Sequence, residues 1–189
     1  MKLHLGCGRS PRDGWVNLDM ADLPGVDVVF DLDSIAAGAR LPFDDDTFTD
    51  IVGIDLIEHL HHPLEVMQEL HRVAADGARL LFELPYGSSD DAWEDPTHRR
   101  PYFIGSWGYF SQPYYWRADY GYRGDWRCDA VILDLWDTDG TERELLGQVM
   151  TFRNIVARQT VQLVAVKPAR PADRSLMDQP QTLFRKFGG

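Results

Sequence analysis

The sequence predicts an α/β fold with a mostly parallel sheet and an antiparallel closing strand. Strand-like and helix-like segments alternate through the first half of the chain, which is typical of a parallel sheet covered by helices. Two further strand-like segments, at 125–136 and 160–167, come late and are expected to close the sheet as an antiparallel pair. With 189 residues, 44% of them hydrophobic, the chain is long enough for one domain with a full core.

Five strands are expected in the first half, at 2–6, 15–19, 27–31, 49–55 and 78–84. The first of them runs straight into Gly6-Cys7-Gly8, where glycine lets a ligand approach the backbone without a Cβ in the way. Apolar residues recur at helical spacing over 62–75, so a helix is expected there, ended by Asp76-Gly77. Only ten residues separate Gly8 from the second strand's Asp19, and proline and glycine interrupt them, so at most one helical turn fits.

The composition indicates the cellular compartment and the kinds of binding partner to expect. The formal net charge of −11 disfavours a nucleic-acid backbone as partner, because phosphate binding needs concentrated Lys and Arg. The two cysteines, Cys7 and Cys128, do not make a disulfide framework, and no apolar run is long enough to cross a bilayer. We therefore expect a soluble cytoplasmic protein with a small-molecule partner and no membrane partner; homodimer formation is left open.

Four motifs follow one another in a fixed order. They are the LHLGCG segment over 3–8, Asp19 at the end of the second strand, Leu41-Pro42-Phe43 before an acidic turn, and the IEHL segment over 57–60. In this order they resemble the motifs of class I S-adenosylmethionine-dependent methyltransferases, and the resemblance covers residues 2–86. The short first crossover, with Ser10 in place of the usual third glycine, is similar to that of a small type 11-like group of these enzymes. The resemblance implies a Rossmann-like fold and S-adenosylmethionine as cofactor.

The resemblance also implies where the cofactor lies. Ligands of open parallel sheets bind at the carboxyl ends of the strands. The glycine turn would face the methionine part, and Asp19 would accept hydrogen bonds from both ribose hydroxyls, as a carboxylate can. The expected cofactor-binding residues are Leu5, Gly6, Cys7, Gly8, Asp19, Met20, Asp31, Leu32, Asp55 and Leu56.

A nicotinamide cofactor is the alternative for such a glycine turn. It would need a G-x-G-x-x-G turn that enters a helix, followed by an acid about twenty residues further on. Here the third glycine and the helix are missing, and the acid comes sooner, so this alternative is disfavoured.

Two histidines are the candidate catalytic residues. Methyl transfer to a hydroxyl or amine needs the acceptor aligned and a base that removes its proton. His98, at the start of an aromatic-rich segment, and His59, in the IEHL motif, could serve as this base. The alternatives are that His98 is an exposed loop residue bonded to the backbone and that His59 orients the first turn of its helix.

A metal site is a further option at the same motif. Asp55, Glu58 and His59 have the i, i+3, i+4 spacing that would place three metal ligands on one face of a helical turn. The pattern resembles the Glu-x-x-Glu-His of metal-dependent methyltransferases that act in the ubiquinone pathway and on small RNAs. Because Glu-His also occurs widely in relatives without a metal, we expect none here.

We expect residues 1–168 to form the methyltransferase domain and 169–189 a C-terminal tail that wraps the body or stays mobile. The chain starts at a strand, without the N-terminal helices that roof the acceptor pocket in many class I enzymes. Residues 86–126, rich in aromatics and with a short helix over 103–110, are therefore expected to form the acceptor side or lid. The alternative for these aromatics is core packing.

The expected reaction is methyl transfer to a small or medium acceptor, with an oxygen of a sugar or related metabolite preferred and nitrogen next. Two alternatives stay open. One is a non-catalytic S-adenosylmethionine-binding module in regulation or assembly. The other is a nucleic-acid methyltransferase with a basic face around Arg99, Arg100, Arg117 and Arg123.

Overall fold

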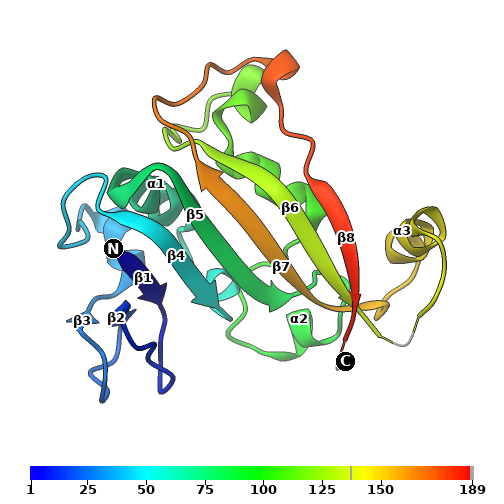
Figure 1. Ribbon diagram of the computed structural model, residues 1–189, viewed down its shortest axis with the longest axis horizontal. Coiled ribbons are helices and arrows are strands. Elements are labelled where there is room, and N and C mark those ends of the chain that lie inside the picture. The colour runs from blue at the N-terminus through cyan, green and yellow to red at the C-terminus, as the bar shows by residue number, and fades with distance from the viewer. Residues whose placement is uncertain (137, 188–189) are drawn as a thin grey trace.

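Figure 1 shows the computed structural model, which describes residues 1–136 and 138–187. Within them the chain forms one 8-stranded sheet in the order β3-β2-β1-β4-β5-β7-β6-β8. The strands are β1 (Lys2–Leu5), β2 (Val16–Asp19), β3 (Val28–Val29), β4 (Phe48–Ile54), β5 (Ala74–Pro85), β6 (Trp126–Leu135), β7 (Val156–Ala165) and β8 (Gln181–Lys186).

Strands β1 to β5 run parallel, so their carboxyl ends lie at one edge of the sheet. Strand β7 is antiparallel to both of its neighbours, β5 and β6. The predicted fold class is therefore confirmed. Strand β5 begins earlier than expected, at Ala74, and a bulge interrupts its pairing with β4 where Gly77 has a left-handed backbone (φ +74°).

The helical segments are short apart from α1 and α3. They are η1 (Leu32–Ala37), η2 (Ile57–His59), α1 (Pro63–Val73), α2 (Asp91–Glu94), η3 (Ile104–Phe110), η4 (Gln112–Trp116), α3 (Glu142–Thr151) and η5 (Arg174–Leu176), where η marks a 3-10 helix. Helix α1 begins with Pro63, which suits the first helical position, and buries Met67 and Leu70. The IEHL motif forms only the single turn η2, separate from α1.

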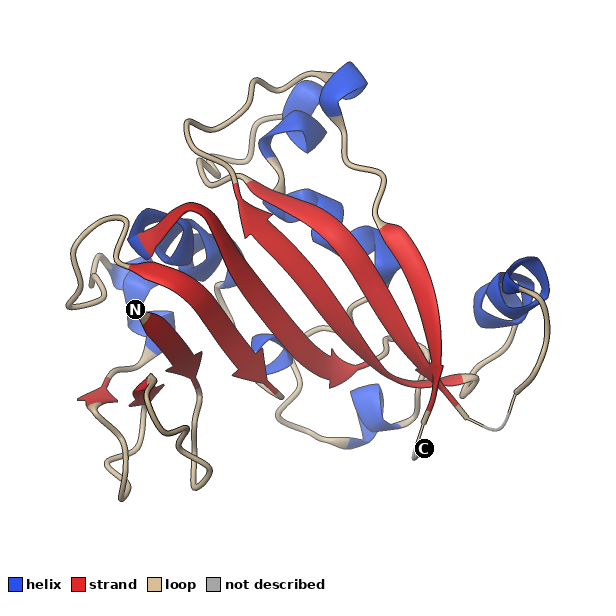
Figure 2. Ribbon diagram, viewed as in Figure 1, coloured by secondary structure: helices blue, strands red, loops and turns tan. Residues whose placement is uncertain are grey.

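The helices do not cover both faces of the sheet. Figure 2 shows α1 behind the sheet, and no helix in the described part of the chain crosses its front. The reason lies in the connections: the segments from β1 to β2 and from β2 to β3 contain no helix, and for the first of them at most one helical turn was predicted. A cavity of about 530 Å³ lies on this uncovered face, lined by residues of β4, β5 and β7.

The aromatic-rich segment divides into two parts. Residues 86–103 lie at the carboxyl edge of the sheet, where the Gly87 amide donates to the Tyr102 carbonyl at 2.7 Å. Residues 104–126 instead lead away from this edge: Trp107 is fully buried, stacks on Phe82 of β5, and donates from Nε1 to Gln159 Oε1 at 3.1 Å. Most aromatics of the second part are core residues, because the short crossovers leave this sheet with few helices to fill its core.

The segment predicted as a tail contributes a strand instead. Strand β8 pairs in parallel with β6, and Arg185 forms an ion pair with Asp134 of β6. Phe184 of this strand packs against the core. The strand was not predicted, because prolines and charged residues precede it in the sequence. The last two residues of the predicted tail lie outside the described residues.

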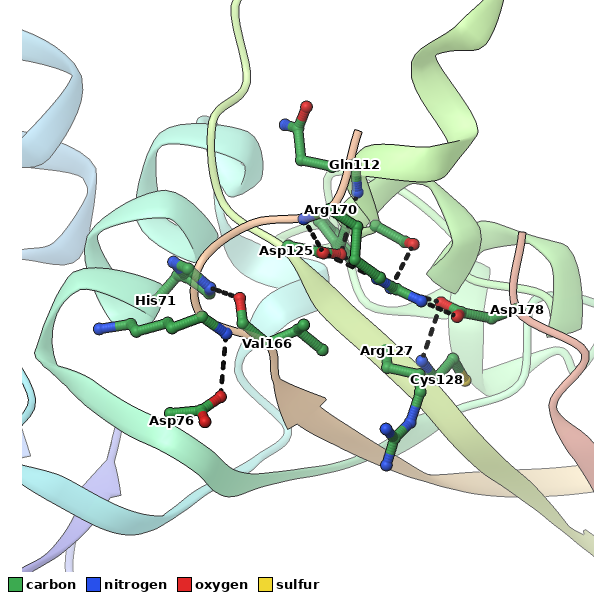
Figure 3. A network of polar contacts seen from close by, with 12 residues as sticks. His71, Asp76, Gln112, Asp125, Arg127, Cys128, Val166, Arg170 and Asp178 are labelled. Carbon is green, nitrogen blue, oxygen red and sulfur yellow. Dashed lines mark hydrogen bonds and ion pairs between the residues drawn. The ribbon is translucent and has the colours of Figure 1, made fainter. Parts of the chain in front are cut away.

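A buried ion pair fastens this C-terminal segment to the sheet (Figure 3). Asp125, with no exposed surface, accepts from Arg170 at both oxygens, at 2.8 Å each, and from the Gln112 amide at 3.1 Å. Arg170 also donates to Asp178 at 2.7 Å, and Asp178 accepts from the Cys128 amide. Every charge in this network has a partner.

Candidate functional site

The glycine turn after β1 requires glycine at its first position. Gly6 has a left-handed backbone (φ +59°), and a Cβ there would lie 2.9 Å from Leu56 Cδ1. Gly8 is also left-handed (φ +51°), and its amide donates to Asp19 Oδ2 at 2.8 Å. This hydrogen bond fixes the turn against the end of β2. The second carboxylate oxygen, Oδ1, accepts from the Ala21 amide at 2.9 Å. Because a carboxylate oxygen has more than one lone pair, Asp19 can still accept from a ligand.

A cavity of about 270 Å³ lies at the carboxyl edge beside this turn. It brings together predicted cofactor residues from four separate segments: Gly6, Asp19, Met20, Asp31, Leu32, Asp55 and Leu56. Leu5, Cys7 and Gly8 do not line it; the side chains of Leu5 and Cys7 are buried in the protein. The sequence prediction missed four lining residues, Leu18, Phe30, Asp33 and Leu60, of which Leu18 and Phe30 directly precede predicted ones.

Asp55 is held in an unusual conformation at the end of β4. Its φ of +47° is strained for a residue with a side chain, and such strain is concentrated at functional sites. Its carboxylate pairs with Arg158 of β7 at 2.5 Å, and Arg158 also contacts Glu83 at 3.2 Å. Arg158 was not predicted, because nothing in its local sequence marks it and its partner lies far away in the chain.

The predicted grouping of Asp55, Glu58 and His59 is corrected by the structure. Asp55 turns to Arg158, and His98 joins Glu58 and His59 instead. One ligand atom from each of these three residues lies within 4.8 Å of the others, and the His59 and His98 rings meet edge to face at 4.7 Å. The edge of the sheet thus brings together the two candidate catalytic histidines, although they lie far apart in the sequence.

Glu58 is the acidic residue of this cluster, and its carboxylate is buried. Only 3% of its surface is exposed, and neither carboxylate oxygen has a hydrogen-bond partner within the described residues. Burial raises the pKa of the Glu58 carboxyl to about 7, because the charged form loses its water, and the nearby Asp55 charge adds to this shift.

The two histidines are oriented by their Nδ1 atoms. His98 Nδ1 lies 3.2 Å from the Ala92 carbonyl, which can only accept, so this nitrogen carries the proton. His59 Nδ1 lies 3.0 Å from Thr97 Oγ1, whose own proton goes to Asp95 Oδ1 at 2.6 Å, so His59 must donate as well. In the neutral form of each ring the lone pair therefore resides on Nε2. His59 also lines the cavity of about 270 Å³, called the cofactor cavity below because the predicted cofactor-binding residues line it.

A second cavity, of about 410 Å³, is lined in part by Arg158. Its aromatic walls are Trp136 and Phe187, and its polar lining includes Asp91, Asn154 and Arg158. Because Arg158 pairs with Asp55, which lines the first cavity, the Asp55–Arg158 pair joins the two cavities.

The four arginines considered for a basic face do not gather on one surface. The Arg99 amide donates to the Glu58 carbonyl at 2.7 Å, which places it at the carboxyl edge. Arg117 stacks on Trp116 of η4, and Arg123 is paired with Asp119, in the segment drawn at the opposite end of the sheet in Figure 1. The arrangement therefore gives no support to the nucleic-acid alternative.

Comparison with known proteins bears on the family and the fold. Residues 3–82, fewer than half of the chain, match a family model described as a methyltransferase domain. The fold is shared with S-adenosylmethionine-dependent methyltransferases of known structure. Both findings bear out the predicted resemblance to class I methyltransferases and support an enzyme with S-adenosylmethionine as its cofactor.

Solved structures agree on the fold. A methyltransferase from Archaeoglobus fulgidus has a TM-score of 0.54 at 13% identity, over 86% of this chain and 85% of that one. A Thermotoga maritima protein described as a possible histamine N-methyltransferase has a TM-score of 0.52 at 12% identity, over 87% and 81%. An Aquifex aeolicus methyltransferase has a TM-score of 0.50 at 15% identity, over 87% and 81%. No curated protein sequence matches this chain. None of the helices in the described residues is long and apolar enough to cross a membrane.

Proposed function

We propose that this methyltransferase transfers the methyl group to an oxygen of a small or medium acceptor, a sugar or a related metabolite. The observation that carries the proposal is the pair of histidines beside the cofactor cavity. Their Nδ1 atoms are engaged, which leaves a lone pair on each Nε2 to accept the proton of a hydroxyl. A hydroxyl needs such a base, because it is a weak nucleophile until its proton is removed.

The second cavity supports a sugar as acceptor. Its aromatic rings offer flat apolar faces for a sugar ring, and Asp91, Asn154 and Arg158 offer hydrogen-bonding groups for hydroxyls. Residues 86–103, the part of the aromatic-rich segment at this edge, supply a further exposed ring, Trp93. Its Nε1 donates to the Gly87 carbonyl at 2.9 Å, which holds the indole in place.

The experiment is methyl transfer from labelled S-adenosylmethionine to a panel of sugars, sugar nucleotides and a small-molecule extract. Label in an alkali-stable sugar ether would support the proposal, and label in an amine alone would contradict it. If His98 serves the reaction, His98→Ala should reduce turnover by about 10²–10⁴-fold with cofactor affinity unchanged. The matched control is His61→Ala, an exposed histidine next to η2 that should turn over normally.

A further inference from the structure

We propose that Glu58, His59 and His98 bind a divalent transition-metal ion, such as Zn²⁺, Fe²⁺ or Mn²⁺, at the edge of the cofactor cavity. The inference deepens the proposed function and rests on it for the hydroxyl acceptor. With an ion bound, the two histidines would hold the metal, and loss of the hydroxyl proton to water would replace the direct proton transfer to imidazole. The inference differs from the sequence-based expectation of no metal, because the ligand set is a different one: His98 stands where Asp55 was considered.

Small side-chain movements would let the three donor atoms share one ion. They lie within 4.8 Å of one another. Ligands about 2.1 Å from a tetrahedral ion lie roughly 3.4 Å apart, so movements that bring the donor atoms about 1 Å closer together would complete the site. Two imidazoles and one carboxylate favour a transition metal over Mg²⁺ or Ca²⁺, which prefer oxygen ligands alone.

Both histidines have the Nδ1 hydrogen bond that is typical of metal-ligating histidines. A metal-ligating histidine has one nitrogen on the metal and usually donates its other N–H to a carbonyl or carboxylate. His98 donates from Nδ1 to the Ala92 carbonyl. His59 donates from Nδ1 to Thr97 Oγ1, which in turn donates to Asp95, a histidine–hydroxyl–carboxylate chain. Each Nε2 is therefore left with its lone pair available.

The Glu58 carboxylate supplies the second, independent observation. It is buried, and among the residues that the structure describes it has no hydrogen-bond partner for either oxygen. A buried carboxylate without a partner is costly, and natural proteins compensate such groups with a charge, hydrogen bonds or a metal. The Asp95 carboxylate adds negative charge nearby, with its Oδ2 3.9 Å from His98 Nε2. A cation would compensate both acids.

The ion would act on the acceptor. Three protein ligands leave coordination positions open, and an acceptor hydroxyl bound there loses its proton more readily. Because both Nε2 lone pairs would then be engaged, the proton would leave to water rather than to imidazole. The oxygen would form its bond to the methyl carbon as the carbon–sulfur bond breaks, and that electron pair would stay on sulfur, which becomes a neutral thioether.

The test is metal binding by the full chain, stripped with a chelator and then titrated with Zn²⁺ by calorimetry and with Co²⁺ by visible absorption. We expect one tight site per chain and a Co²⁺ spectrum of mixed nitrogen and oxygen ligation. Glu58→Gln and His98→Ala should each weaken binding by at least tenfold. Thr97→Val, which only orients His59, should weaken it by about 10–100-fold. Thermal unfolding of each variant checks that it is folded.

His61→Ala is the matched control, because His61 is exposed and its ring neighbours that of His62. Equal affinity in wild type and the Glu58 and His98 variants, or loss of binding in His61→Ala, would overturn the site. Methyl transfer that proceeds at full rate after chelation would refute the ion's role while leaving the proposed function intact. A metal site that persists in a protein that methylates only amines would refute the proposed acceptor and not the site.

Discussion

Asp125 and Glu58 are both buried carboxylates, but their surroundings are opposite. Asp125 accepts hydrogen bonds from Arg170 at both oxygens and from a backbone amide. Glu58 has no such partner in the described part of the chain, although two histidines lie close by. The first acid joins two segments of the fold, so its removal should act on stability. The second does not contribute to the fold in this way, so its removal should act on the chemistry at the edge of the sheet.

The largest effect on stability is expected at Asp125. Asp125→Ala would leave the Arg170 guanidinium, itself largely buried, with only the Asp178 carboxylate and the Ser111 hydroxyl as partners. Breaking a buried pair by removing one partner typically costs about 3–5 kcal/mol. Urea unfolding should show a loss of this size, while Asp129→Ala, at an exposed pair, should change the free energy of unfolding little. A loss below about 1 kcal/mol would contradict the stabilising role that distinguishes Asp125 from Glu58.

Asp19 is an intermediate case, since it accepts from two backbone amides and still faces the cofactor cavity. Asp19→Ala should weaken S-adenosylmethionine binding by about 1.5–3 kcal/mol, because the ribose hydroxyls lose a charged acceptor. Calorimetry on the purified variant measures this. Asp22→Ala, at an exposed neighbouring acid, is the control. Unchanged affinity in Asp19→Ala would place the ribose elsewhere, and binding of NAD alone would refute the cofactor.

Glu58→Gln should have the opposite sign from Asp125→Ala. Because the buried carboxylate has no partner to lose, the isosteric amide should leave the free energy of unfolding unchanged or raise it by up to about 1 kcal/mol. Urea unfolding without added metal measures it, with Glu65→Gln on the exposed face of α1 as control. A loss of 2 kcal/mol or more would mean that Glu58 holds the fold together as Asp125 does.

The smallest effect is expected from pH near the Asp125 network. His71 donates to the Val166 carbonyl at 3.0 Å, and burial lowers the pKa of His71 below 6.5. The unfolded chain, with its ordinary pKa, therefore binds more protons just below pH 6.5, so stability falls as the pH drops through this window. His71→Gln should reduce this pH dependence. Unfolding at a series of pH values tests this, and an identical slope in the variant would contradict it.

The sequence predicts best those features that are set by residues close together in the chain. The glycine turn, the acids after β2 and β4 and the parallel strands were predicted, because strand periodicity and the carboxyl-edge rule are local or topological signals. Arg158 and the contact between His59 and His98 were not, because β7 and the segment after α2 reach the site only through tertiary packing. Strand β8 was missed for a related reason: it pairs at the margin of the sheet, where few of its side chains are buried.

The uncovered face and short crossovers of the first three strands also bear on local stability. Strand β3 is held by only two residues of pairing, and β2 is four residues long, whereas β5 and β7 pair over seven positions at the centre of the sheet. Amide hydrogens of β1 to β3 should therefore exchange with solvent well before those of the central strands, in a local opening that leaves the rest folded. Because Asp19 and Asp31 belong to this margin, S-adenosylmethionine would bind only its closed form. The slowing of exchange at these strands would then report cofactor occupancy directly.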